Sequence, residues 1–220
     1  MRGYFGRLAV ATVAALTLAA ATGAARAQGD RAGDFDYYVL ALSWSPNWCA
    51  RRADSGDAAQ CTPGAGFGWL LHGLWPQHEA GWPADCATDA PWPTRAESAA
   101  MADLMGSGGL AFYQWRKHGR CTGLAGRDYY RLARTAFERV TRPPVLRQLD
   151  DPVRLPAAVV EDAFLEANPA LAADTITITC RDGAIQEARI CLDRGLLPRP
   201  CGADIRRDCA LDRALLHPIP

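Results

Sequence analysis

The sequence lacks a net charge, internal repeats and low-complexity tracts. Its 220 residues carry 24 basic and 24 acidic side chains, and 49% of the residues are hydrophobic while 22% are charged. This composition is typical of a folded globular protein and excludes a disordered, collagen-like or coiled-coil chain. The length suits a single domain of ordinary size. The balanced charge also excludes non-specific binding to nucleic acid through bulk positive charge.

Long hydrophobic runs are absent outside the N-terminus. There, Arg2 and Arg7 precede the uncharged residues 8–21, and Ala25-Arg26-Ala27 gives a small-x-small pattern. This order predicts a cleaved signal peptide, residues 1–27, and a mature chain, residues 28–220. A membrane-spanning helix is the weaker alternative, because the run is shorter than the ~20 residues that a span requires. Removing three arginines leaves 24 − 3 = 21 basic against 24 acidic residues, a charge of −3. We expect a periplasmic or secreted protein that does not associate with a membrane after cleavage.

Closely spaced cysteine pairs are also missing, which argues against a zinc ribbon or finger. All eight cysteines follow the predicted signal peptide, and the number is even. In an exported chain this predicts four disulfides, but the sequence alone leaves many pairings open. The cysteines are Cys49, Cys61, Cys86, Cys121, Cys180, Cys191, Cys201 and Cys209.

Apolar periodicity predicts an α+β domain in which strands, then helices, then strands follow one another. Thr94 and Glu97 form a capping box at the start of one predicted helix, and Asp182-Gly183 is a hairpin turn between two predicted strands. The expected strands cover 35–42, 67–75, 175–180 and 185–192, the helices 94–105, 110–118, 128–140 and 156–167, and the loops 47–66 and 76–94.

Lysine is almost absent from the sequence. The chain has 23 arginines but a single lysine, Lys117, which lies directly before His118. Helical spacing places Gln114, Lys117 and His118 on one face of the predicted helix 110–118. His72 lies in the predicted strand 67–75. A lone histidine is more often a packing residue, but two imidazoles serve as base and acid near neutral pH. A neighbouring ammonium group stabilises charge that develops on a phosphoryl or acyl oxygen.

These residues lie in two segments that resemble the catalytic segments of the ribonuclease T2 family. The segments are Leu71-His72-Gly73-Leu74-Trp75-Pro76 and Trp115-Arg116-Lys117-His118-Gly119-Arg120-Cys121. The opening Phe35–Trp44 and the Cys180…Ile190-Cys191 pattern also resemble that family. The resemblance implies a single disulfide-linked α+β domain, residues 28–220, with a central, mainly antiparallel sheet and helices packed around it.

The resemblance further implies an endoribonuclease that cleaves single-stranded RNA. The ribose 2′-OH attacks the adjacent phosphorus, giving a 2′,3′-cyclic phosphate that is then hydrolysed to a 3′-phosphate. By position, His118 is the base, His72 the acid, and Lys117 stabilises the transition-state charge. DNA lacks the attacking hydroxyl and is not a substrate. The family places Trp75 and Gln77 where residues contact a base, and Phe112 is a further candidate for that contact.

Two positions differ from the commonest family pattern. The family usually has Glu where this chain has Gln114, and often His where it has Tyr113. Gln keeps a carbonyl oxygen but loses the negative charge. We therefore expect His118 to be less readily protonated and Lys117 less firmly oriented, with reduced activity or a lower pH optimum. Tyr113 retains a hydroxyl that donates to a phosphate oxygen, so this change is the milder one.

The resemblance also implies particular partners and disulfide pairs. We expect a monomer that binds single-stranded RNA and uses no metal or other cofactor. Two alternatives remain: a catalytically impaired secreted binding or inhibitor protein, with Gln114 as the first sign of decay, and a metal-dependent phosphoesterase, which no ligand-spaced cluster supports. The implied pairs are Cys49–Cys61, Cys86–Cys121, Cys180–Cys209 and Cys191–Cys201.

Overall fold

The computed structural model describes Met1, residues 30–52 and residues 58–220. The expected signal peptide, residues 1–27, lies outside the described residues apart from Met1. Among the described residues, no helix has both the length and the apolar character that a membrane span requires.

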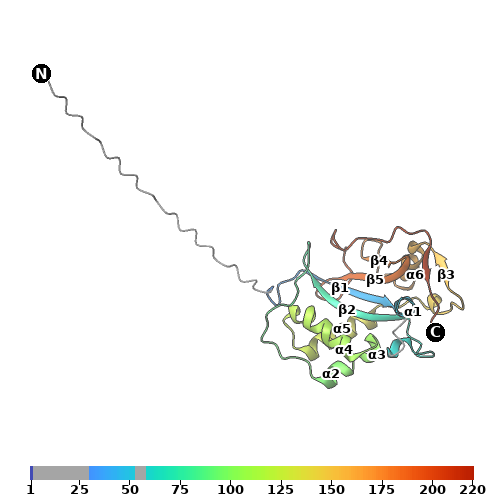
Figure 1. Cartoon of the computed structure of the whole chain (residues 1–220), viewed down its shortest axis with the longest axis horizontal. Coiled ribbons are helices and arrows are strands. Elements are labelled where there is room, and N and C mark those ends of the chain that lie inside the picture. Colours follow the sequence, from blue (N-terminus) through green and yellow to red (C-terminus); the bar gives the residue numbers. More distant parts are fainter. Residues whose placement is uncertain (2–29, 53–57) are drawn as a thin grey trace.

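A six-stranded sheet forms the centre of the domain, with the strand order β2-β1-β5-β6-β3 and β4 paired to β5 (Figure 1). All strand pairs are antiparallel except β5–β6. The strands are β1 (Tyr37–Trp44), β2 (Trp69–Gln77), β3 (Val153–Leu155), β4 (Ile176–Arg181), β5 (Ala184–Leu192) and β6 (Ala214–Leu216). The α-helices are α1 (Ser45–Ala50), α2 (Arg95–Ala99), α3 (Ala102–Met105), α4 (Gly108–Lys117), α5 (Gly126–Arg139) and α6 (Ala157–Ala167). Short 3-10 helices are η2 (Ala59–Cys61), η3 (Gly119–Thr122) and η4 (Pro144–Arg147).

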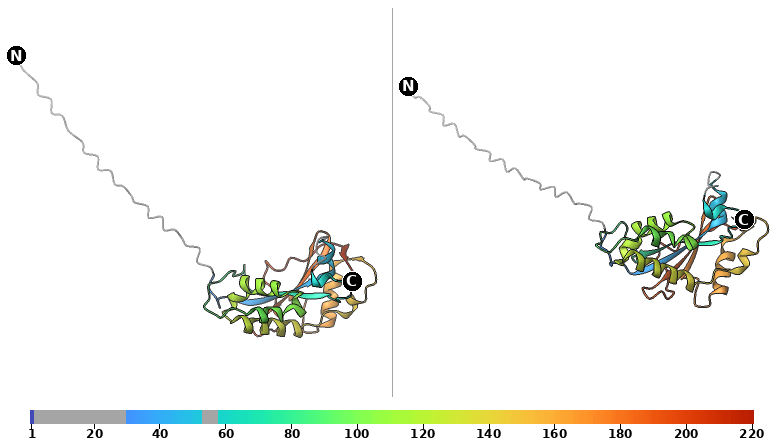
Figure 2. Two further views of the ribbon diagram at one scale, coloured as in Figure 1. Left: turned by 60° about the horizontal axis from the view of Figure 1, so that its bottom comes forward. Right: turned by 90° about the horizontal axis from the view of Figure 1, so that it is seen from below.

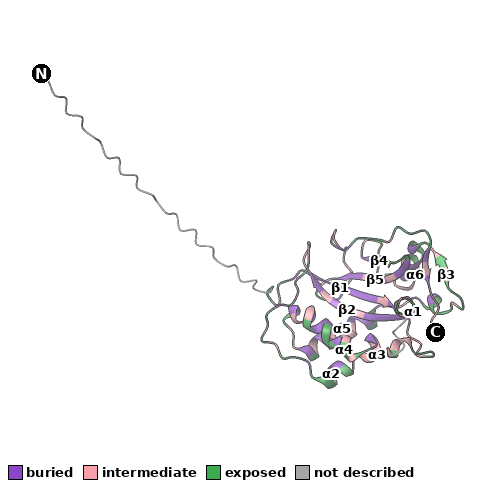
Figure 3. Ribbon diagram, viewed as in Figure 1, coloured by how far each residue is buried: buried purple, intermediate pink, exposed green. Residues whose placement is uncertain are grey.

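Strand β1 divides the interior into two faces because successive side chains of a strand point to opposite sides. Tyr38, Leu40 and Leu42 belong to the large core, and helices α2–α5 gather on one side of the sheet (Figure 2). Tyr37 and Val39 belong to a smaller buried cluster that contains two disulfide cysteines. Figure 3 shows that the central strands are buried along most of their length. The central strands therefore separate the large core from a second, less crowded face.

The α+β architecture, the mainly antiparallel sheet and several local signals agree with the sequence predictions. The capping box is present: Thr94 Oγ1 accepts from the Glu97 amide, and the Glu97 carboxylate accepts from the Thr94 amide. The β4–β5 turn has Asp182 and Gly183 at φ values of 52° and 79°. Such left-handed values suit the two-residue turns that join antiparallel strands.

Three details differ from the sequence predictions. The predicted loop 47–66 overlaps α1, whose first turn contains a proline, a residue that is favourable at that position because it lacks an amide to satisfy. The predicted helix 94–105 is split into α2 and α3, because the amides of Met101 and Leu104 bond three rather than four residues back. The short strands β3 and β6 were not predicted.

Four disulfides close the structure, and they are the four pairs that the family resemblance implies. Cys86–Cys121 joins the loop after β2 to η3, and Cys191–Cys201 joins β5 to the C-terminal segment. The other two are Cys49–Cys61 and Cys180–Cys209. Two bridges therefore anchor the segments that follow His118 and β5.

Candidate active site

A β-bulge aims His72 at the less crowded face of the sheet. In the β1–β2 pairing, Ala41 lies opposite Gly73 and Leu42 opposite Leu71, so His72 has no partner of its own. Leu71 and Leu74 both belong to the large core although they lie three residues apart, which regular alternation along β2 does not allow. An extra residue in one strand breaks this alternation and redirects a side chain, as is common near active sites. His72 therefore faces the same side as Gly73.

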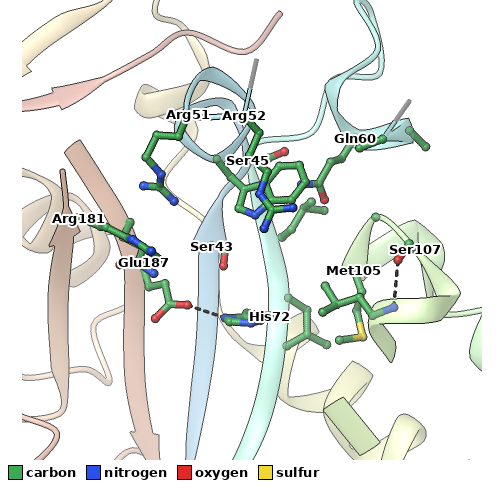
Figure 4. A pocket seen from close by; sticks show the side chains of 18 of the residues that line it. Ser43, Ser45, Arg51, Arg52, Gln60, His72, Met105, Ser107, Arg181 and Glu187 are labelled. Carbon is green, nitrogen blue, oxygen red and sulfur yellow. Dashed lines mark hydrogen bonds and ion pairs between the residues drawn. The ribbon is translucent and has the colours of Figure 1, made fainter. Parts of the chain in front are cut away.

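A buried carboxylate holds the His72 imidazole across strand β1. Glu187 lies on β5 opposite the small Ser43, and its Oε1 is 2.5 Å from His72 Nδ1. The side chain of Glu187 is 1% exposed, and its second oxygen accepts from Arg189 Nε at 2.9 Å. Figure 4 shows the His72–Glu187 contact, with Ser43 beside it.

The protonation state of Glu187 determines which nitrogen of His72 carries a proton. Burial alone would raise the Glu187 pKa, but the hydrogen bonds and charges of His72 and Arg189 outweigh it and lower the pKa below its ordinary value. An ionised carboxylate only accepts hydrogen bonds. His72 Nδ1–H is therefore the donor, and Nε2 remains available for proton exchange with another molecule.

Helix α4 carries Gln114 and Lys117 and ends at His118, and these three residues form the second part of the site. Ser107 caps its N-terminus by accepting from the Leu110 amide at 3.0 Å, and His118 is the residue at its C-terminal end. Lys117 lies in the last turn, where a cation interacts favourably with the helix dipole. Gly119 then allows close packing, because a Cβ there would lie 2.7 Å from the Tyr129 ring. The local sequence thus fixes where His118 leaves the helix.

His118 lies in surroundings opposite in charge to those of His72. Its side chain is buried, and burial, followed by the positive charges of Lys117 and His72, lowers the His118 pKa to about 4. No carboxylate of the described residues contacts this imidazole, so nothing there offsets the lowering. His118 is therefore a neutral imidazole at neutral pH, able to accept a proton.

Trp75 lies between the two imidazoles. Its ring centroid is 5.1 Å from that of His72 and 5.4 Å from that of His118. The indole Nε1–H donates to Gln114 Oε1 at 2.8 Å. Gly73 makes this bond possible, because a Cβ at that position would lie 2.3 Å from the indole nitrogen. Gln114 thus orients the Trp75 ring, and this ring separates the imidazoles of His72 and His118.

The remaining residues suggested by the sequence do not all reach this centre. Gln77 is only 3% exposed, and its position at the end of β2 leaves it little surface for a ligand. Phe112 and Tyr113 lie on the outer side of α4, 37% and 43% exposed. Phe112 packs near Trp92, with 5.9 Å between ring centroids. The two exposed aromatic residues are accessible to a ligand but lie outside the cluster around Trp75.

Comparison with protein families gives a match to the ribonuclease T2 family model over residues 35–201. The chain belongs to the ribonuclease T2 family. The matched range contains β1, β2, α4 and β5, the elements that carry the two histidines and Glu187.

Two curated bacterial relatives support this membership. A ribonuclease of Aeromonas hydrophila is 43% identical over 110 residues, which are 50% of this chain and 48% of the relative. A probable ribonuclease of Haemophilus influenzae (strain ATCC 51907 / DSM 11121 / KW20 / Rd) is 32% identical over 120 residues, which are 49% of this chain and 44% of the relative. The matched segments thus span about half the length of these relatives.

Solved structures share the fold at low sequence identity. The RNase-related protein from Calystegia sepium has a TM-score of 0.67 at 18% identity, covering 83% of this chain and 97% of that one. RNase NT in complex with 5′-AMP has a TM-score of 0.57 at 18% identity, covering 82% and 97%. The chain therefore shares its fold with proteins that are only 18% identical to it in sequence.

Sequence reasoning did not identify Glu187, which forms a hydrogen bond with His72, or Arg189, which donates a hydrogen bond to Glu187. A signal for Glu187 was present: a carboxylate within the predicted strand 185–192, whose other residues are mostly apolar. A strand that pairs on both sides buries most of its side chains, and a buried carboxylate requires a partner. The sequence does not identify that partner, because it lies 115 residues away on another strand.

Proposed function

We propose that this chain is a metal-independent endoribonuclease that cleaves single-stranded RNA by transphosphorylation. The observation that supports this most is the opposite charge around the two imidazoles. A buried carboxylate forms a hydrogen bond with His72, whereas Lys117 and, within the described part of the chain, no carboxylate adjoin His118. Environments that separate two titratable groups in this way are typical of an acid and base pair.

In the first step, neutral His118 accepts the proton of the ribose 2′-OH, whose oxygen attacks the adjacent phosphorus. The bond from phosphorus to the 5′ oxygen breaks, and that oxygen takes a proton from His72 Nε2 while Glu187 stabilises the positive imidazole. The products are a 2′,3′-cyclic phosphate and a free 5′-hydroxyl. Lys117 supplies positive charge to the non-bridging oxygens as negative charge builds up on them.

In the second step, the roles reverse and water attacks the cyclic phosphate. His72 takes the water proton, the bond to the 2′ oxygen breaks, and His118 returns a proton to that oxygen. The product is a 3′-phosphate, and both histidines regain their starting states. This proposal requires no group beyond the side chains described, and the need for a 2′-OH restricts the substrate to RNA.

The proposed setting is outside the cytoplasm, with the enzyme acting as an exported monomer. Four disulfides support this setting, because such bonds persist in oxidising compartments. The relatives described as a ribonuclease and a probable ribonuclease support the activity. RNase NT, which was solved with 5′-AMP, supports binding of a nucleotide by this fold.

The test is RNA cleavage by oxidised protein, residues 28–220, in the presence of EDTA. We expect products with 2′,3′-cyclic phosphate ends, loss of cleavage in His118→Ala and strong reduction in Lys117→Ala. His78→Ala is the matched control, because His78 is a partly exposed histidine paired with Asp36 and outside the site. DNA of the same sequence should remain intact.

Two outcomes would reject the proposal. Cleavage that EDTA abolishes would favour a metal-dependent phosphoesterase. Folded protein that binds RNA without cutting it would favour a secreted binding protein, with Gln114 as the first residue to restore to Glu.

A further inference from the structure

A cavity of about 770 Å³ opens beside His72 on the side away from helix α4's C-terminus. Its walls come from α1, η2, β1, β2, β5, the β4–β5 turn and the α3–α4 junction (Figure 4). The described residues that line it include His72 and Glu187 but not Lys117 or His118. The cavity therefore adjoins only one half of the proposed catalytic pair, and its volume is in the range of nucleotide-sized ligand sites.

Three arginines line this cavity: Arg51, Arg52 and Arg181. Arg51 Nη1 is buried and has no hydrogen-bond partner in the part of the chain that the structure describes. Burial, followed by the positive charge of Arg181, lowers the Arg51 pKa. A buried guanidinium nitrogen without a partner is unfavourable unless something else satisfies it.

The acidic groups of the cavity already have partners. Glu187 bonds His72 and Arg189. Asp182 lies 3.6 Å from Arg181, in a largely exposed pair. Arg181 and Arg52 repel Arg51 while Asp182 and Glu187 attract it, and the effect of Arg181 is the largest of the four. Among the described residues, neither carboxylate forms a hydrogen bond with the buried Arg51 Nη1. An added anion would relieve that repulsion, and guanidinium groups bind phosphate through paired, charge-assisted hydrogen bonds.

We infer that this cavity binds the backbone phosphate next to the leaving nucleoside, on the 3′ side of the cut. The inference rests on the proposed function, in which His72 protonates the 5′ oxygen of the leaving nucleoside. RNA that passes from His118 to His72 continues into the cavity that His72 borders. Arg51 and Arg181 then hold the following phosphate, so that the enzyme favours bonds with at least one more nucleotide downstream.

Short chimeric substrates with a single ribose test this placement, because only the bond after that ribose is cleavable. The reference is a dinucleotide, ribonucleotide then deoxynucleotide. One trinucleotide adds a deoxynucleotide downstream, and the other adds it upstream. Both trinucleotides carry the same number of phosphates, so a general effect of charge acts on both equally.

The variants are Arg51→Met and Arg181→Met, compared with Arg206→Met, which removes an exposed arginine outside the cavity. Arg181 is 65% exposed, so its replacement is compatible with folding even if that of Arg51 is not. We expect each cavity variant to reduce kcat/KM for the downstream-extended substrate, relative to the upstream-extended one, by about tenfold, the value of one charge-assisted bond. Arg206→Met should leave this ratio unchanged.

An unchanged ratio in both cavity variants would overturn the phosphate site while leaving the proposed function intact. Equal losses on both trinucleotides would do the same, since they would indicate a general effect on the fold or the catalytic centre. If wild-type protein cleaves none of the three substrates, the proposed function fails, and the phosphate site fails with it.

Discussion

The proposed general base, His118, should stay neutral, and therefore active, well below the pH at which a histidine of ordinary pKa becomes protonated. The His118 pKa is lowered to about 4 by burial and by the charges of Lys117 and His72. At pH 5, a base with this pKa is about nine-tenths neutral, whereas a histidine with the usual pKa of about 6.5 is only about 3% neutral. Glu187 does not limit activity there either, because its pKa lies below its ordinary value.

The assay is kcat/KM for the single-ribose dinucleotide, measured from about pH 3 to about pH 8. We expect the acid limb of the profile near pH 4. Lys117→Met removes one of the positive charges that lower the His118 pKa, so its residual activity should have an acid limb at higher pH. A wild-type limb between about pH 6 and pH 7 would refute the reasoning, since it would place His118 at its unperturbed pKa.

The same pKa change predicts a loss of stability in acid. The unfolded chain binds a proton at His118 more readily than the folded protein, so stability falls as the pH drops from about 6.5 to about 4. The shift of about 2.5 pH units corresponds to about 3 kcal/mol. Urea unfolding at both pH values, with His118→Asn as reference, isolates this share from that of the carboxylates. Equal pH dependence in the two proteins would contradict the prediction.

Three substitutions test other parts of the site. Glu187→Gln keeps a hydrogen-bond acceptor but removes the charge that stabilises the acid, so kcat should fall by at least about tenfold with little change in KM; equal kcat values would contradict the role of the carboxylate. Gln114→Glu places a carboxylate at a buried position, 2% exposed, one helical turn before His118, and should move the acid limb towards neutral pH by about one unit; identical pH–rate profiles would reject this. Gly119→Ala sets a Cβ 2.7 Å from the Tyr129 ring and should lower the free energy of unfolding in urea by about 1–3 kcal/mol; an unchanged midpoint would show that the ring yields easily.

Local sequence signals predicted the elements that are stabilised locally. The capping box at Thr94 and the turn at Asp182-Gly183 depend on neighbouring residues, and both are present. The strands β3 and β6 have three residues each and exist because they pair with one another. A three-residue strand carries too little periodicity to be recognised before its partner is known.

Sequence reasoning predicted the part of the site that lies on α4 but not the contact between His72 and Glu187. The helical spacing of Gln114 and His118 and the scarcity of lysine pointed to α4 directly. The orientation of His72 could not be predicted, because it depends on a bulge in the register between β1 and β2. The contact with Glu187 depends in addition on the register between β1 and β5. A change of one residue in either register would point the two side chains to opposite faces.

The single lysine has a consequence for the chemical handling of this protein. Apart from the terminal amine, Lys117 Nζ is the one primary amine in the chain, and its side chain is partly exposed at the end of α4. Besides the terminal amine, acylating reagents and reductive methylation therefore modify the proposed catalytic centre rather than a scattered set of surface groups. Label incorporated at this amine therefore reports on the proposed site, where bound oligonucleotide is expected to shield it. Coupling to a solid support through Lys117 Nζ would attach the molecule by the face that carries the proposed site and should abolish the proposed activity.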